Sequence, residues 1–258
     1  LTAIALLPQG TKLQGVVISQ TCRLWRSIEV LMHVLAQTGM RLADALQLNM
    51  NAAVFDFKTM LLQHVDPRVM ELLTDEDWVL LKPGKSKSDP LGKHWAAFPI
   101  YLPVIRAAPV NAAKKLYAYY SDFPIAAAKR DKTPLFVDNA GKRLTRSFLS
   151  RVLHSIIAAV NPELRIHRDT HSWHSFRIYL ACALKAAGAD NERIKAMVRW
   201  VSDDSLRIYA RDNRDHYGEW LRKATSSDVK SVQVSNLPVI DDDMAFALLN
   251  SVIDILDQ

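Results

Sequence analysis

Apolar residues recur at helical spacing in several separate segments of this chain, and this feature most constrains its fold. In the first segment Leu24, Ile28, Leu31 and Leu35 share one face of a helix, which is expected to end at Gly39. Further helices are expected at residues 110–120, 145–157, 174–188, 191–197 and 206–210, with a short one near Arg41. Amphipathic helices must bury their apolar faces, so these segments are expected to pack around a shared core.

The middle of the chain predicts a small antiparallel hairpin. Residues 78–81 and residues 95–100 have the pattern of strands, and Pro83-Gly84 and Pro103 end them. A long Lys-rich loop joins the two, whereas residues 49–77 favour no particular element. The predicted fold class is therefore α+β, mainly α, with a small antiparallel sheet.

Composition limits the compartments and partners of the chain. Its 258 residues are 49% apolar, which is enough for one large core. A net charge of +6 gives a mild bias toward polyanions. No uncharged apolar run approaches about 18 residues, and the opening LTAIALLPQG is too short for a signal peptide, so no membrane partner is expected. Cys22 and Cys182 fit two reduced thiols in an intracellular protein.

We expect two parts in the chain. Residues 1–223 would form one large domain, and residues 224–258 a polar linker, with one strand at 232–234, followed by a C-terminal helix. An apolar stripe marks that last helix and would allow it to dock on its own domain: Ala245, Leu248, Leu249, Val252, Ile253 and Leu256.

His174 and Arg177 are three residues apart in a predicted helix, so they share a face. The forked donors of an arginine suit phosphate oxygens, and a histidine can move a proton near neutral pH. Tyr209 becomes a nucleophile where cations stabilise a phenolate, and the indole N–H of Trp200 can donate to a phosphate oxygen. Taken singly, each residue has an ordinary alternative: a solvated helix face for the first three, and burial in the core for Trp200.

Arg41 lies in the segment TGMRLAD, where a glycine ends one helix and the arginine enters the next. Asp44 is placed one turn later and could orient a catalytic Arg or His. The alternative is an ordinary surface ion pair, which contributes little to stability.

Together these segments resemble the tyrosine recombinase (phage integrase) family over roughly residues 22–215. Four segments match in order and spacing: TGMRLAD resembles the first-arginine motif, HSFR the His-x-x-Arg motif, VRWVSDDSLRIYAR the Trp or His box with the nucleophilic Tyr, and PLFVDNAGKRLTRSFL the turn and helix leading toward the second arginine. The segments HSFR and RW-x-S-D are similar to segments in recombinases of DIRS-like and Crypton-like mobile elements.

The family also has a hairpin lysine. KSKSDPLGKHWAAFPI resembles that turn and assigns the role to Lys87, with Lys85 as the alternative because it directly follows Gly84. The stretch between Arg41 and Lys87 is longer than in most members, so residues 49–77 are expected to hold an insertion.

The resemblance implies a mechanism without metal or nucleotide cofactor. Tyr209 would attack a DNA phosphate to form a 3′-phosphotyrosyl link, with Arg41 and Arg177 holding the phosphate oxygens. His174 would exchange the Tyr proton, Lys87 would protonate the leaving oxygen, and Trp200 would donate its N–H. The resemblance makes residues 1–223 the catalytic domain. The implied partners are double-stranded DNA and further copies of the chain, as a tetramer on DNA in the nucleus or nucleoid. In this family a terminal helix often packs onto a neighbouring protomer, and the polar linker at 224–240 would permit that exchange.

Several alternatives remain open. His167, His171 and His174 have spacings that could suit metal ligands, although Asp169-Thr170 favours a loop between them. Four basic residues could contact DNA phosphates or simply be solvated: Lys142, Arg143, Arg146 and Arg151. The rival functions are a type IB topoisomerase, a domesticated DNA-binding protein that no longer cleaves, and a generic helical interaction domain.

Overall fold

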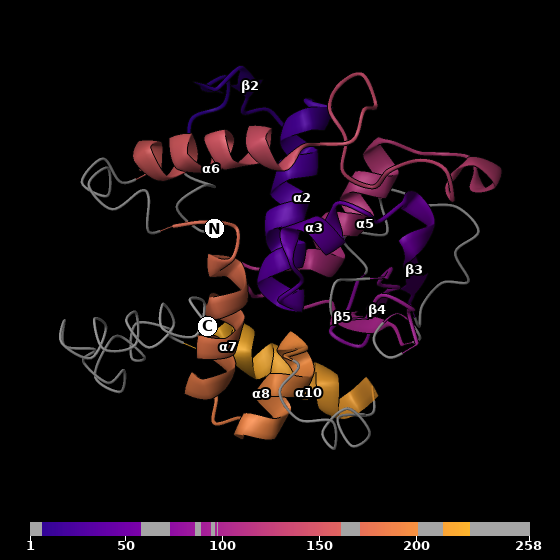
Figure 1. The fold of residues 1–258 in the computed structure, drawn as a ribbon, viewed down its shortest axis with the longest axis vertical. Helices are drawn as coiled ribbons and strands as arrows, with labels where there is room; N and C mark the ends of the chain where they lie inside the picture. The colour runs from indigo at the N-terminus through magenta and orange to yellow at the C-terminus, as the bar shows by residue number, and fades with distance from the viewer. Residues whose placement is uncertain are drawn as a thin grey trace, which may run out of the picture.

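The computed structural model describes residues 7–57, 73–85, 89–93, 96, 98–160, 171–200 and 214–227. One long helix lies at the centre, another crosses one end of it, further helices gather beyond its other end, and a small sheet flanks it (Figure 1). The helices are α2 (Arg23–Thr38), α3 (Leu42–Ala45), α5 (Ala112–Asp122), α6 (Arg146–Val160), α7 (Ser175–Ala186), α8 (Asn191–Val198) and α10 (Arg214–Ser226), with 3-10 turns η1 (Met50–Ala52) and η2 (Ala127–Lys129). The strands are β1 (Lys12–Leu13), β2 (Val16–Val17), β3 (Ala53–Asp56), β4 (Trp78–Leu81) and β5 (Ile100–Pro103).

Helix α2 is more deeply buried than its apolar spacing predicts. Every residue from Trp25 to Thr38 is buried except Glu29, because α5, α7, β2 and β5 pack around it. The sequence shows a single apolar face, and the other faces are covered although they carry polar side chains such as His33 and Gln37. Helix α2 is therefore the central element from which the rest of the fold is positioned.

The expected helix boundaries are confirmed where the sequence carries capping residues. The Thr145 hydroxyl accepts from the N–H of Phe148 at 3.3 Å at the start of α6. The Asp190 carboxylate accepts from the N–H of Arg193 at 2.7 Å at the start of α8. Gly39 ends α2 with a left-handed φ of 59°, as a C-terminal glycine should.

The predicted hairpin is confirmed as β4 and β5, but its second strand was placed wrongly. That strand begins at Ile100 instead of at residue 95, and it includes Pro103. Pro103 lies at the end of a strand that pairs on one side only, where its missing N–H is tolerated. Strand β3, which the sequence did not indicate, pairs antiparallel with β4 and completes the order β3-β4-β5.

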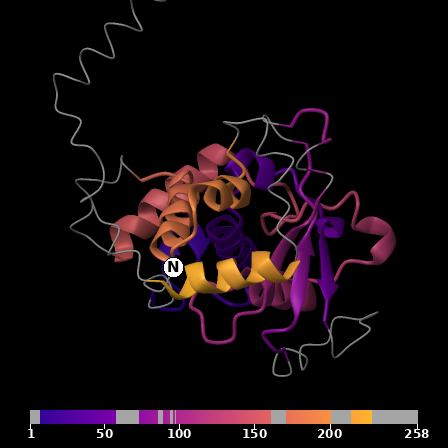
Figure 2. The ribbon, with the colours of Figure 1, turned by 90° about the horizontal axis from the view of Figure 1, so that it is seen from below.

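Helix α10 was not predicted either, and it bridges two parts of the fold. It contacts α7 on one side and β5 on the other, and Figure 2 shows it running between the neighbouring helices and the sheet. Its backbone approaches the sheet closely at Gly218, which faces the ring of Trp78. The predicted linker start at residue 224 falls inside this helix. The expected helix at 206–210, the strand at 232–234 and the C-terminal helix lie outside the described residues.

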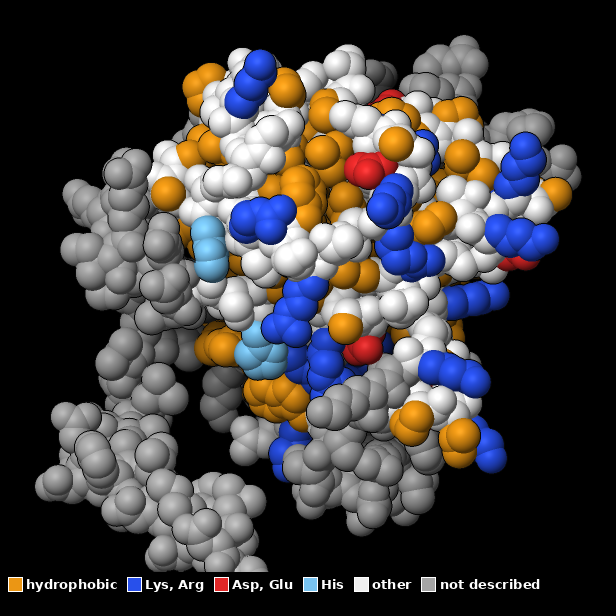
Figure 3. Space-filling model, turned by 45° about the horizontal axis from the view of Figure 1, so that its top comes forward, with side chains coloured by type: hydrophobic (Ala, Val, Ile, Leu, Met, Phe, Trp, Pro, Cys, Tyr) orange, Lys and Arg blue, Asp and Glu red, His pale blue; other side chains and the backbone are white. Residues whose placement is uncertain are grey.

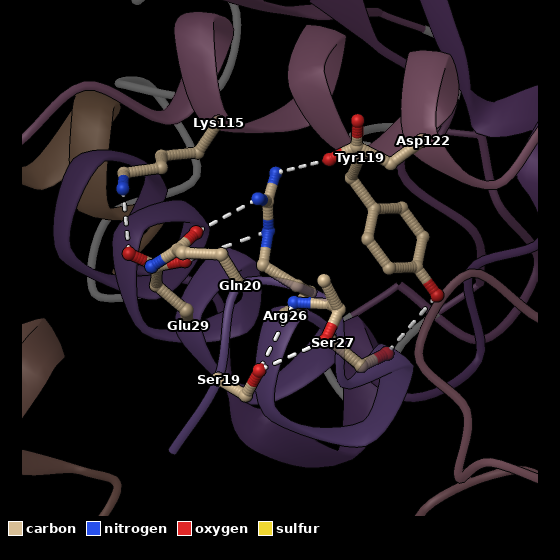
Figure 4. Close-up of polar contacts among 9 residues, drawn as sticks. Ser19, Gln20, Arg26, Ser27, Glu29, Lys115, Tyr119 and Asp122 are labelled. Atoms are coloured by element: carbon tan, nitrogen blue, oxygen red, sulfur yellow. Dashed lines mark hydrogen bonds and ion pairs between the residues drawn. The ribbon is translucent and has the colours of Figure 1, made fainter. Parts of the chain in front are cut away.

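A network of charged and polar side chains joins the first half of α2 to α5 (Figure 4). Arg26 donates to Gln20 Oε1 at 2.8 Å and pairs with Asp122 Oδ2 at 2.9 Å. Glu29 pairs with Lys115 at 2.5 Å. Arg26 lies about 20 Å from Gly39 along the helix axis, at 1.5 Å per residue. The network therefore braces the scaffold at the end of α2 remote from Gly39.

The buried His33 on α2 predicts acid sensitivity. Burial and the Lys115 charge lower its pKa from 6.5 to about 3, and its Nδ1 accepts from the N–H of Asn111 at 3.1 Å. Below pH 6.5, His33 binds a proton in the unfolded chain but not in the folded chain. The free energy of unfolding therefore falls as the pH drops to about 3, by roughly 4 kcal/mol in total. Urea unfolding at a series of pH values should show this loss.

His33→Asn is the matched control for this prediction. Its amide oxygen can accept the Asn111 N–H but does not titrate, so the variant should lose less stability than wild type between pH 6.5 and pH 4. Parallel pH profiles for the two proteins would contradict the assignment.

Candidate active site

Arg177, in the first turn of α7, is the best-anchored residue that the sequence singled out. It is 3% exposed, its Nη1 donates to the Gly39 carbonyl at 2.8 Å, and its Nη2 donates to the Arg199 carbonyl at 3.0 Å. A guanidinium has five N–H donors in a fixed plane, so two bonds fix its orientation and the other donors keep their directions. The side chain is thus held rigidly between the ends of two other helices.

Both carbonyls belong to residues that end a helix in the left-handed conformation. Gly39 closes α2, and its N–H donates to the Leu35 carbonyl at 3.0 Å. Arg199 closes α8 with φ 55°, and the N–H groups of Arg199 and Trp200 donate back to Ala196 and Lys195. A helix C-terminus carries partial negative charge, so the two ends together stabilise the buried cation.

The turn between α2 and α3 positions Arg41 and Asp44. The Thr38 hydroxyl donates to the Val34 carbonyl at 2.7 Å and accepts from the N–H of Met40 at 3.2 Å, which fixes this turn. Arg41 is the residue that precedes α3, and the N–H of Asp44 donates to its carbonyl at 3.0 Å. The Arg41 side chain is 39% exposed, and its Nη1 lies 3.9 Å from Asp44 Oδ2.

Electrostatic coupling brings these residues together with a fourth, Arg199. Burial, and then the charges of Arg41 and Arg199, lower the pKa of Arg177 to about 10, while Asp44 opposes this shift. Burial raises the pKa of Asp44 against the pull of Arg41, Arg199 and Arg177. Three arginines act on a single carboxylate, so the cluster carries excess positive charge suited to an oxyanion.

His174 and Trp200 are attached to this cluster through the backbone. The His174 carbonyl accepts from the N–H of Arg177 at 2.9 Å, and His174 itself is exposed just before α7. Trp200 directly follows Arg199 and is 41% exposed. The alternative that Trp200 is buried in the core is therefore wrong.

Two predicted site residues, Lys87 and Tyr209, lie outside the described residues, as does His167. The alternative lysine, Lys85, is exposed beyond β4 in the hairpin loop. In the described parts of the chain, no group of three or more His, Cys, Asp or Glu could hold a metal ion. No helix of the described parts is long and apolar enough to cross a membrane.

The four basic residues proposed for DNA contact fall into two groups. Lys142, Arg146 and Arg151 are exposed. Arg143 instead turns inward, donating to the Leu46 carbonyl and to Asn49 Oδ1 at 2.9 Å, and so braces the loop after α3. Figure 3 shows one face of the molecule on which Lys and Arg side chains far exceed acidic ones. Positive charge of this kind is favourable for binding the DNA backbone.

Sequence reasoning missed Arg199. Its residue type gives no sign of a left-handed backbone, which glycine normally adopts at this position of a helix end. Its position before Trp200 in the matched segment was the available signal, but it did not distinguish a surface cation from one that faces the site.

Residues 18–216 match the model of the phage integrase family. No curated protein and no solved structure matches the chain. The matched segment contains α2, α3, α7 and α8, which position the arginine cluster, but only the first three residues of α10. The chain therefore belongs to the phage integrase family, the tyrosine recombinases, which bind DNA and cleave and rejoin its strands.

Proposed function

We propose that this protein is a site-specific DNA recombinase or integrase that works through a 3′-phosphotyrosyl intermediate. The observation that carries the proposal is the clamp on Arg177. A buried guanidinium whose position is fixed by two carbonyls, with Arg41 beside it, is a preorganised site for the negative charge that develops on a phosphate under attack.

In the proposed reaction, the Tyr209 oxygen attacks the scissile phosphorus and its proton passes to His174. The bond from phosphorus to the 5′-oxygen breaks, and that oxygen leaves as a hydroxyl with a proton from Lys87, or from Lys85 if the alternative assignment holds. Arg41, Arg177 and the Trp200 N–H bind the non-bridging oxygens. Rejoining is the same sequence in reverse, so bond energy is conserved without a cofactor.

DNA outside the reacting phosphate would contact the exposed cations Lys142, Arg146 and Arg151. Arg143 would support this surface indirectly, through the loop that it braces. Strand exchange joins two duplexes, so the proposed working form is a tetramer on DNA, with the C-terminal helix passed between neighbours. Transposition of a mobile element is the proposed setting.

The decisive experiment traps the covalent intermediate with Tyr209→Phe as the test variant. A pool of end-labelled duplexes of randomised sequence, nicked at staggered positions, lets the short cut fragment diffuse away. With chelator present, wild type should give a protease-sensitive DNA–protein band on a denaturing gel. Tyr209→Phe should give none, because the phenol oxygen that forms the bond is missing.

Tyr217→Phe is the matched control, because Tyr217 also lies near the site and acts on the pKa of Arg199. It should retain the band. A band that survives Tyr209→Phe and disappears in Tyr217→Phe would overturn the assignment of the nucleophile.

Two further outcomes would identify the rival functions. No band from any variant, with DNA binding retained on a native gel, would identify a non-cleaving DNA-binding protein. Relaxation of supercoiled plasmid without any exchange between two sites would identify a type IB topoisomerase. The trapped complexes on a native gel also report the number of protomers.

A further inference from the structure

Arg199 has a backbone conformation that an arginine adopts only at a cost. Among the described residues, two non-glycines have positive φ: Gln14, within a tight hairpin turn, and Arg199. The left-handed conformation costs a residue with a Cβ about 1–2 kcal/mol. The hydrogen bonds at the end of α8 would be equally satisfied by glycine. Strain of this kind persists where a side chain has a role, so the Arg199 side chain requires an explanation.

The backbone of Arg199 lies against Arg177, and its side chain acts electrostatically on Asp44. Its Nε is buried and has no hydrogen-bond partner within the described parts of the chain. Burial lowers the pKa of Arg199, whereas Tyr217 and Asp44 raise it, so Asp44 lies within its electrostatic reach. Asp44 is only 17% exposed and lies 3.9 Å from Arg41, one of the two arginines expected to bind phosphate. One carboxylate is therefore shared by neighbouring guanidinium groups.

We infer that Arg199 is a positioning residue that offsets the charge of Asp44, so that Arg41 and Arg177 remain directed toward the phosphate. Without Arg199, the attraction of Asp44 falls more fully on Arg41, which lies 3.9 Å from it. The backbone carbonyl of Arg199 has a second role that does not depend on its side chain, since it anchors Arg177. This inference rests on the proposed function for its cleavage readout.

Arg199→Gly separates the two roles, because it keeps the carbonyl, relieves the strain and removes the charge. We expect covalent-complex formation at saturating nicked DNA to slow roughly tenfold, which corresponds to one moderate coupling between neighbouring charges. Arg199→Lys should stay near the wild-type rate because it restores the charge. Equal rates for wild type and Arg199→Gly would overturn the inference.

Rescue by a second substitution identifies the mechanism. Arg199→Gly combined with Asp44→Asn should recover most of the lost rate, since the carboxylate that draws Arg41 away is gone. Arg199→Gly with Glu192→Gln restores the same net charge at the exposed start of α8, and should recover nothing. Rescue by both would reduce Arg199 to a general attraction for DNA and would overturn the inference.

Thermal unfolding without DNA tests the same coupling independently of any cleavage. Arg199→Gly should raise Tm by about 2–4 °C from strain relief alone. Arg199→Gly should raise Tm further in the Asp44→Asn protein, because there the substitution removes no attraction between Arg199 and a charged Asp44. Equal shifts in both backgrounds would overturn the inference. If wild type forms no covalent complex, the proposed function fails while this thermal cycle still decides the role of Arg199.

Discussion

Arg177→Lys is expected to slow covalent-complex formation at least about a hundredfold, the usual cost of losing one preorganised donor to a developing oxyanion. Arginine and lysine are not equivalent at position 177. Arg177 reaches the carbonyls of Gly39 and Arg199 with separate nitrogens of one rigid plane. A lysine ammonium is a single point, so it cannot hold both carbonyls and present a fork to a phosphate at once.

The same substitution also costs stability, because one buried carbonyl at a helix end loses its donor. We expect a loss of about 1–3 kcal/mol in the free energy of unfolding. Denaturant unfolding and the suicide-substrate rate should be measured on the same preparation, at a temperature where the variant is fully folded. The defect in rate must persist there if Arg177 contributes to the chemistry.

Arg151→Lys is the matched control, since it makes the same exchange at an exposed position of α6. It keeps the positive charge and should change neither stability nor cleavage rate noticeably. An Arg177→Lys protein that cleaves as fast as Arg151→Lys would show that Arg177 only braces the fold, and the proposed mechanism would lose its central element.

Gly218→Ala is expected to destabilise the protein by about 3 kcal/mol, the upper end of the usual overpacking range. An added Cβ would lie 1.8 Å from Cη2 of Trp78 and 2.7 Å from two further ring atoms, all closer than atoms can approach. The Trp78 ring cannot move aside easily. It is 4% exposed, with the guanidinium of Arg222 over one face and the ring of Tyr101 against its edge.

Gly84→Ala is a suitable comparison, because a Cβ there would meet nothing within 4 Å and its backbone is not left-handed. Thermal and urea unfolding of both variants should show a large loss for Gly218→Ala and almost none for Gly84→Ala. Helix α10 begins five residues after Tyr209. Cleavage by Gly218→Ala should therefore also fall, and unchanged stability would mean that α10 does not dock on the sheet as described.

The elements that could be predicted from the sequence are those specified by local signals. Thr145, Asp190 and Gly39 mark helix ends through their own chemistry, and the structure confirms all three. Strand β3 could not be predicted because its partner, β4, lies beyond a long connection, and its few residues do not alternate in burial. Helix α10 combines a glycine with many charged residues, so its apolar positions gave too weak a pattern.

The sequence predicted part of the site as well. Arg177 and Asp44 were identified by motif, and the structure places them in one cluster with Arg41. The roles of Arg199 and Gly39 as holders of Arg177 could not be predicted, because they use backbone carbonyls, which every residue has. These carbonyls point at one guanidinium because α2 and α8 each end in a left-handed residue. That orientation exists only in the assembled fold.

The two hydrogen bonds that hold Arg177 also have a consequence for the stage of folding at which the site is formed. Gly39 is separated from Arg177 by 138 residues in the chain, and their hydrogen bond forms only after α2 and α7 have docked. Contacts between such distant residues are slow to form because the intervening chain must first be ordered. By the proposed mechanism, an emerging or half-folded polypeptide would therefore have no place to hold a DNA phosphate, and strand breakage would be confined to molecules that have finished folding.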